Sequence, residues 1–151
     1  MILEDIFFPF LFIWSIVAVL AFIALFYKNA PYGRYLTLDS NYKIPSRIGW
    51  IIMESPTIIG MLIFIVLFRN KIGQTEIIFC LLWLSHYIHR TMIWPFRAQL
   101  KGKSMAVGVV SMALFFNSVN ISLQCIWMFI FGNYSDDWLI SIPFILSLIH
   151  I

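Results

Sequence analysis

Charged residues are scarce in this chain of 151 residues: they make up 11% of it, whereas hydrophobic residues make up 62%. The mean hydropathy of +0.92 lies far above the range of soluble globular domains. This balance excludes a soluble globular domain. It predicts an all-α integral membrane protein, a polytopic helix bundle whose partner is the lipid bilayer.

Cysteine and histidine are also rare, with two and three copies. Cys80 and Cys125 lie in apolar segments, where a small buried hydrophobe is a commoner role than a disulfide partner. His86 and His89 are spaced like two ligands on one helix face, but Glu54 is the only evident third ligand, so no metal site is expected. The basic residues form no patch, so nucleic acid is not an expected partner, and no obligate protein partner is expected either.

Long apolar runs are what the chain has in abundance. Four of them are long enough to cross a bilayer as helices: Ile6–Tyr27, Ile48–Phe68, Ile77–Pro95 and Ser104–Phe131. A fifth begins near Trp138 and is cut short by the end of the chain. We expect residues 1–151 to form a single membrane domain with four complete spans and a truncated fifth.

Basic residues concentrate in the connections that follow the first and third spans. Eight of the ten lie there or near the end of the third span: Lys28, Arg34, Lys43, Arg47, Arg90, Arg97, Lys101 and Lys103. The positive-inside rule places these two connections in the cytosol and the amino terminus outside. Residues 29–33 supply turn chemistry after the first span, and Pro45 and Ser46 mark the entry to the second.

Glu54 is an acid inside an otherwise uncharged apolar span. A carboxyl group near the middle of a membrane costs about 3 kcal/mol on insertion scales, so such residues usually face a partner or a polar cavity. The cluster from Ser85 to Thr91 in the third span is the obvious partner. At 1.5 Å per residue, Glu54 and Tyr87 each lie about 12 Å from the cytosolic end of their helices, so their depths match.

Two kinds of role remain open for Glu54. It can stabilise helix packing by pairing with Arg90 or a histidine, or it can relay protons in a transporter. Alternatively, burial can favour its neutral form, which donates a hydrogen bond together with the Tyr87 hydroxyl to one carbonyl oxygen. In the fourth span Asn117, Asn120 and Gln124 share one helical face, suited equally to interhelical bonding and to lining a cofactor cavity.

Four motifs in order resemble the amino-terminal part of the steroid 5α-reductase family. They are Ala30–Tyr35, Met53–Thr57, His86–Thr91 with Trp94 and Pro95, and Phe116–Asn120 with Gln124. Asp136–Trp138 also resembles a luminal loop of the family. The resemblance implies a seven-helix membrane enzyme, in the endoplasmic reticulum of a eukaryote or the inner membrane of a bacterium.

The activity implied by the resemblance is NADPH-dependent reduction of the 4,5 carbon-carbon double bond of 3-oxo-4-ene steroids. Glu54 and Tyr87 would polarise the 3-oxo group, and Arg90 and Asn120 are the candidate cofactor residues. The candidate residues of the substrate pocket are four aromatic side chains of the same segments: Trp50, Trp83, His86 and Phe116. Close alternatives are an enoyl-CoA or polyprenol reductase of the same superfamily; His89, where the enoyl-CoA branch typically has lysine, favours the steroid branch. A non-enzymatic transporter or scaffold is the alternative of another class.

The chain departs from the family pattern in two places. Ile121 follows Asn120 where the family has glycine, so close backbone approach is not expected there. The carboxyl-terminal half, which supplies most contacts to NADPH in the family, is also missing. Residues 146–151 read like a translated sequencing adapter, so we expect an incomplete domain that is inactive by itself.

Overall fold

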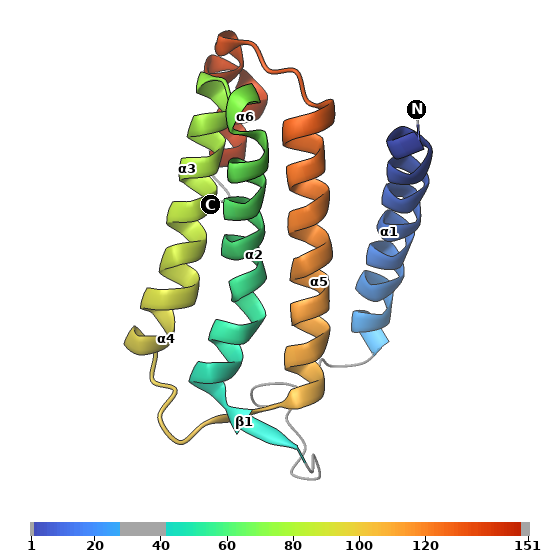
Figure 1. Ribbon diagram of the computed structural model, residues 1–151. Helices are drawn as coiled ribbons and strands as arrows, with labels where there is room; N and C mark the ends of the chain where they lie inside the picture. Colours follow the sequence, from blue (N-terminus) through green and yellow to red (C-terminus); the bar gives the residue numbers. More distant parts are fainter. Residues whose placement is uncertain (1, 28–41, 149–151) are drawn as a thin grey trace. The chain divides into compact units, whose positions relative to one another are not determined.

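The computed structural model describes residues 2–27 and 42–148, and the chain forms two compact units, Met1–Asn41 and Tyr42–Ile151. In the described residues every element is helical except one short two-stranded ribbon (Figure 1). The all-α prediction is therefore confirmed for this part of the chain. The turn expected at 29–33 and the motif at 30–35 lie outside the described residues, as do residues 149–151 of the tail.

Helix α1, Ile2–Tyr27, is the described part of the first unit. It begins four residues before the expected span and contains Pro9 within the helix. Most of its apolar side chains are exposed, including Phe12, Leu20 and Phe22. A helix that is apolar on all sides is suited to lipid, so α1 fits the membrane span predicted for it.

Two short strands join the starts of two long helices. Strand β1, Lys43–Pro45, leads into α2, Ser46–Phe68, and β2, Ser104–Ala106, leads into α5, Val107–Ile126. The strands pair antiparallel, with Ile44 opposite Met105. The Ser46 N–H donates to the Lys103 carbonyl at 3.0 Å, and the Val107 N–H donates to the Tyr42 carbonyl at 3.1 Å. These bonds satisfy amide groups that have no partner inside a first helical turn, so α2 and α5 start at the same end.

The chain between these two helices returns along α2. A short 3-10 turn, η2 (Arg69–Lys71), leads to α3, Gln74–Ile88, where the Gly73 N–H donates to Glu76 Oε2 at 3.0 Å. Helix α3 continues through a π-helical turn, η3 (His89–Ile93), into α4, Trp94–Arg97. Pro95 has no N–H and its ring crowds the preceding turn, which accounts for the changed pattern there. The segment predicted as the third span therefore forms one continuous helical run with a widened turn, and its crossing of the membrane stays a prediction.

Helix α2 is the centre of the second unit and packs against both α3 and α5 (Figure 1). At Gly60, a Cβ atom would lie 2.8 Å from Ile121 Cγ1, so the missing side chain lets the two helices meet. Ile121 is 3% exposed and belongs to a buried cluster of six residues: Met61, Cys80, Ile121, Cys125, Met128 and Phe129. Both cysteines are free thiols in this cluster. The glycine at this contact is therefore on α2, and the Ile121 side chain of α5 packs against it.

The described chain ends in short helical pieces. A π-helical turn, η4 (Trp127–Phe131), completes α5, and η5 (Asp136–Ile140) and α6 (Ile142–Leu148) follow. Within residues 2–27 and 42–148, three helices are long and apolar enough to cross a membrane, namely Ile2–Tyr27, Ser46–Lys71 and Val107–Phe131. These favour a multi-pass integral membrane protein.

Candidate active site

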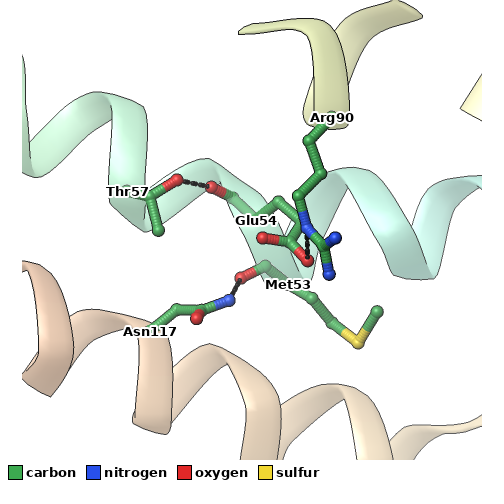
Figure 2. A network of polar contacts seen from close by, with 5 residues as sticks. All are labelled: Met53, Glu54, Thr57, Arg90 and Asn117. Atoms are coloured by element: carbon green, nitrogen blue, oxygen red, sulfur yellow. Dashed lines mark hydrogen bonds and ion pairs between the residues drawn. The ribbon is translucent and has the colours of Figure 1, made fainter. Parts of the chain in front are cut away.

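Glu54 and Arg90 form an ion pair between α2 and η3. Arg90 Nε donates to Glu54 Oε1 at 2.8 Å (Figure 2). The Glu54 side chain is only 6% exposed, whereas that of Arg90 is 45% exposed. The buried acid is thus held by a cation whose other side is open to the surroundings. Within the described residues, this is the only hydrogen bond that joins the two side chains.

The turn of α2 that carries Glu54 is interrupted by Pro56. Proline has no N–H, so the carbonyl of Ile52 loses its usual helical donor. The Ser55 hydroxyl donates to that carbonyl at 3.0 Å, and the Thr57 hydroxyl donates to the Glu54 carbonyl at 2.5 Å. Hydroxyl groups on both sides of the proline therefore bind the carbonyl groups of the broken turn.

Two side chains from the flanking helices bind the same turn. The Asn117 amide of α5 donates to the Met53 carbonyl at 2.7 Å (Figure 2), and the Trp83 indole of α3 donates to the Thr57 carbonyl at 3.2 Å. Met53 directly precedes Glu54, and Thr57 lies three residues after it. The backbone around Glu54 is consequently held from two sides.

Aromatic rings surround the polar groups. The Arg90 guanidinium lies over the Trp50 ring, 5.2 Å from its centroid, and Trp50 makes an edge contact with Trp94 at 4.6 Å between centroids. Such stacking favours a cation that is partly removed from water. It fixes the plane of the guanidinium on one face while Nε binds Glu54.

Tyr87 lies on α3, one helical turn after Trp83 and one before Thr91. Its ring is 4.7 Å from the Trp83 ring and 5.0 Å from the His86 ring, measured between centroids. Tyr87 lies three residues before Arg90 in one continuous helical run, so the two side chains are neighbours on the helix surface. The side chain is partly buried, and its hydroxyl has no hydrogen-bond partner among the described residues. Tyr87 thus combines an available donor with proximity to the ion pair.

The remaining predicted residues are more exposed or make fewer contacts. Asn120 is half-buried on α5 and Gln124 is exposed, and neither amide makes a side-chain hydrogen bond within the described part of the chain. Phe116 is 49% exposed. Of the three predicted amide side chains, Asn117 alone makes an interhelical hydrogen bond among the described residues. For Asn117, the interhelical role is therefore the one that the structure shows.

Apart from Asn117, sequence reasoning assigned no contact with the α2 turn to the groups that hold it. Ser55 and Thr57 were part of a motif without an assigned contact, and Trp83 was assigned to a substrate pocket. The available signal was Pro56 itself, because a proline two residues after a buried acid leaves a nearby carbonyl in need of a donor.

No family model matches the chain. Among curated proteins, "Steroid 5-alpha-reductase DET2" of Solanum lycopersicum is 30% identical over 139 residues, which cover 89% of this chain and 54% of that protein. The chain is a homologue of the steroid 5-alpha-reductases. The DET2 protein of Arabidopsis thaliana is 29% identical over 77% of the chain and 45% of its own length.

Animal relatives in the same family match over a similar region. "3-oxo-5-alpha-steroid 4-dehydrogenase 1" of Bos taurus is 27% identical over 80% of the chain and 48% of its own length. The chain therefore spans about half the length of the steroid 5-alpha-reductase relatives it matches. The matched region covers most of the chain, which is consistent with the predicted resemblance running through the spans that carry Glu54, Tyr87 and Asn117.

Proposed function

We propose that this chain supplies the substrate-polarising part of an NADPH-dependent reductase of the 4,5 double bond of 3-oxo-4-ene steroids. The observation that carries the proposal is the grouping of Glu54, Arg90 and Tyr87 between α2 and α3. The homologues are named as steroid reductases and dehydrogenases, which supports the same reaction class.

The proposed chemistry needs two donors at one carbonyl oxygen. The Tyr87 hydroxyl is one of them, because no described residue accepts its proton. In this proposal the second donor is the neutral form of Glu54: Arg90 binds Oε1, so the proton is carried on Oε2, and the ion pair described above is the ionised form without substrate. Both bonds strengthen as negative charge develops on the carbonyl oxygen, which makes the conjugated carbon more electrophilic.

The reductant in this proposal is NADPH, which supplies the hydride when it is bound. Arg90 and Asn120 fit a group rich in acceptor oxygens. The outer N–H groups of Arg90 have no hydrogen-bond partner among the described residues, and neither has the Asn120 amide. We assign these two residues to cofactor or site support.

We also propose four spans, with α3, η3 and α4 forming the third and the amino terminus outside. At 1.5 Å per residue, the run from Gln74 to Arg97 rises about 36 Å, enough to cross the hydrocarbon core. In this orientation the Arg47 and Arg97 ends face the cytosol, and Glu54 is reached from that side. The membrane is that of the endoplasmic reticulum in a eukaryote or the inner membrane in a bacterium.

The test is NADPH consumption with a 3-oxo-4-ene steroid by membranes that contain the product of the native gene. We expect Tyr87→Phe and Glu54→Leu, each of which removes one donor, to lower turnover about 100-fold to 1000-fold, the usual cost of losing one donor at such a site. Tyr134→Phe and Glu76→Gln are matched controls outside the polar cluster and should keep wild-type turnover. Turnover on an enoyl-CoA but not on the steroid would move the assignment to that branch, and full activity of Glu54→Leu would favour a scaffold or transporter.

A further inference from the structure

We infer that Trp83 and Asn117 are positioning residues that fix the Glu54 carboxyl group relative to the Tyr87 hydroxyl. The inference rests on the proposed function of Glu54 and Tyr87 and assigns the residues that set their geometry. Neither Trp83 nor Asn117 needs to touch substrate in this role.

The need for positioning arises from Pro56. The proline removes one backbone hydrogen bond from the turn that begins at Ile52, and Glu54 lies inside that turn. A helix weakened in this way can bend, and a small rotation at Glu54 is amplified at the end of its side chain. The direction of the carboxyl group therefore depends on groups outside the α2 backbone.

Trp83 links the two halves of the site through one rigid side chain. Its indole N–H donates to the Thr57 carbonyl at 3.2 Å, and its ring lies 4.7 Å from the Tyr87 ring. An indole has few rotatable bonds, so the two contacts cannot vary independently. Trp83 thus fixes the position of the Glu54 turn relative to the Tyr87 ring.

Asn117 holds the opposite side of the same turn. Its amide donates at 2.7 Å to the Met53 carbonyl, which has a second lone pair available beyond any helical bond. Helix α5 is itself fixed one turn further on by Ile121, which packs on Gly60, and at its start by the β1–β2 ribbon. The Asn117 amide therefore holds the Met53 carbonyl of α2 at a fixed position relative to α5.

A positioning role and a purely structural role predict different measurements. Interhelical hydrogen bonds contribute little to the stability of membrane proteins, so their loss should leave the fold intact. A displacement of about 1 Å at reacting groups can lower a rate about 100-fold. The distinctive expectation is a large fall in kcat in a protein that is still folded.

The kinetic test uses Trp83→Phe, which keeps an aromatic ring beside Tyr87 but has no N–H, and Asn117→Leu, which has no donor. In membranes containing the native gene product, we expect kcat for the steroid to fall about 10-fold to 100-fold, with KM changed less than about threefold. Asn117→Gln keeps an amide donor and should recover part of the loss. The controls are Ser85→Ala on α3 and Ser118→Ala on α5, whose hydroxyls bind only within their own helices, to Leu82 and Leu114.

A second measurement does not depend on activity. Solid-state NMR of the protein in liposomes can measure the dipolar coupling between ¹⁵Nε of Arg90 and ¹³Cδ of Glu54. We expect a weaker coupling in Trp83→Phe and Asn117→Leu, and an unchanged one in the two serine controls, with equal helix content by circular dichroism. If the wild type reduces no substrate, the proposed function fails while a weakened coupling still supports positioning. Wild-type coupling in both variants would overturn the inference, whatever the activity.

Discussion

Replacing Arg90 by methionine should destabilise the protein by leaving the buried Glu54 carboxylate without its cation. The two charged groups are 2.8 Å apart. Coulomb's law at an effective dielectric constant of about 20 gives an attraction of about 6 kcal/mol, much of which is offset by desolvation of the pair. Breaking a fully buried pair costs about 3–5 kcal/mol, but the Arg90 side chain is 45% exposed, so we expect a loss of about 2 kcal/mol.

The measurement is unfolding of the protein in mixed micelles on addition of sodium dodecyl sulfate, followed by far-ultraviolet circular dichroism. Glu54→Gln alone should cost less than Arg90→Met, because the amide oxygen still accepts from Arg90 without leaving an unpaired charge. The double variant should therefore be more stable than the sum of the single losses predicts. Arg69→Met, an exposed cation at the far end of α2, is the matched control and should change stability by less than about 0.5 kcal/mol.

A double-mutant cycle of Arg90→Met and Glu54→Gln measures whether the two side chains interact. A coupling energy near 2 kcal/mol supports a buried ion pair that stabilises the α2–η3 contact. Additive effects, within about 0.5 kcal/mol, would show that Glu54 and Arg90 do not interact in the folded protein.

Two further predictions concern other contacts. Gly60→Ala should destabilise the fold by about 1–3 kcal/mol, because the new Cβ atom would lie 2.8 Å from Ile121 Cγ1; in the same unfolding assay, Ile121→Ala should relieve part of this loss, and purely additive losses would contradict the contact. Burial raises the pKa of the Tyr134 phenol above its usual value of 10.0, and Glu76 adds to the increase. The neutral phenol therefore contributes stability that is present below pH 10 and lost as the pH rises through the raised pKa, so Tyr134→Phe should lose less stability than wild type between pH 9 and pH 11; equal losses would contradict this assignment.

Hydropathy alone located the helices well, because long apolar runs leave few other structures possible in a membrane. The helix predicted over Ile48–Phe68 forms as Ser46–Phe68. The β1–β2 ribbon was not predicted, because three-residue strands carry almost no periodic signal and one of them ends in Pro45. Strand pairing at Ser104–Ala106 likewise shortened the predicted fourth helix at its start.

The pairing of Glu54 with a cation could be predicted from the sequence, but the hydrogen bonds that hold the backbone around Glu54 could not. Arg90 was one of the partners considered for Glu54, since an acid in an apolar span calls for a cation. The contact of Asn117 with the Met53 carbonyl depends on how far α5 is rotated about its axis. A sequence pattern places amides on one face of a helix but does not say which of them reaches a neighbour.

The separation of the ion-paired residues along the chain has a consequence for biogenesis. Arg90 is synthesised 36 residues after Glu54, and Asn117 is 64 residues after Met53. At synthesis rates of about 5–20 residues per second, α2 emerges seconds before the cation that its acid requires. Insertion of α2 alone would place an unpaired carboxyl group in lipid, so we expect α2 and α3 to enter the bilayer together as a helical hairpin. Helix α5 then joins a hairpin that already contains its internal ion pair.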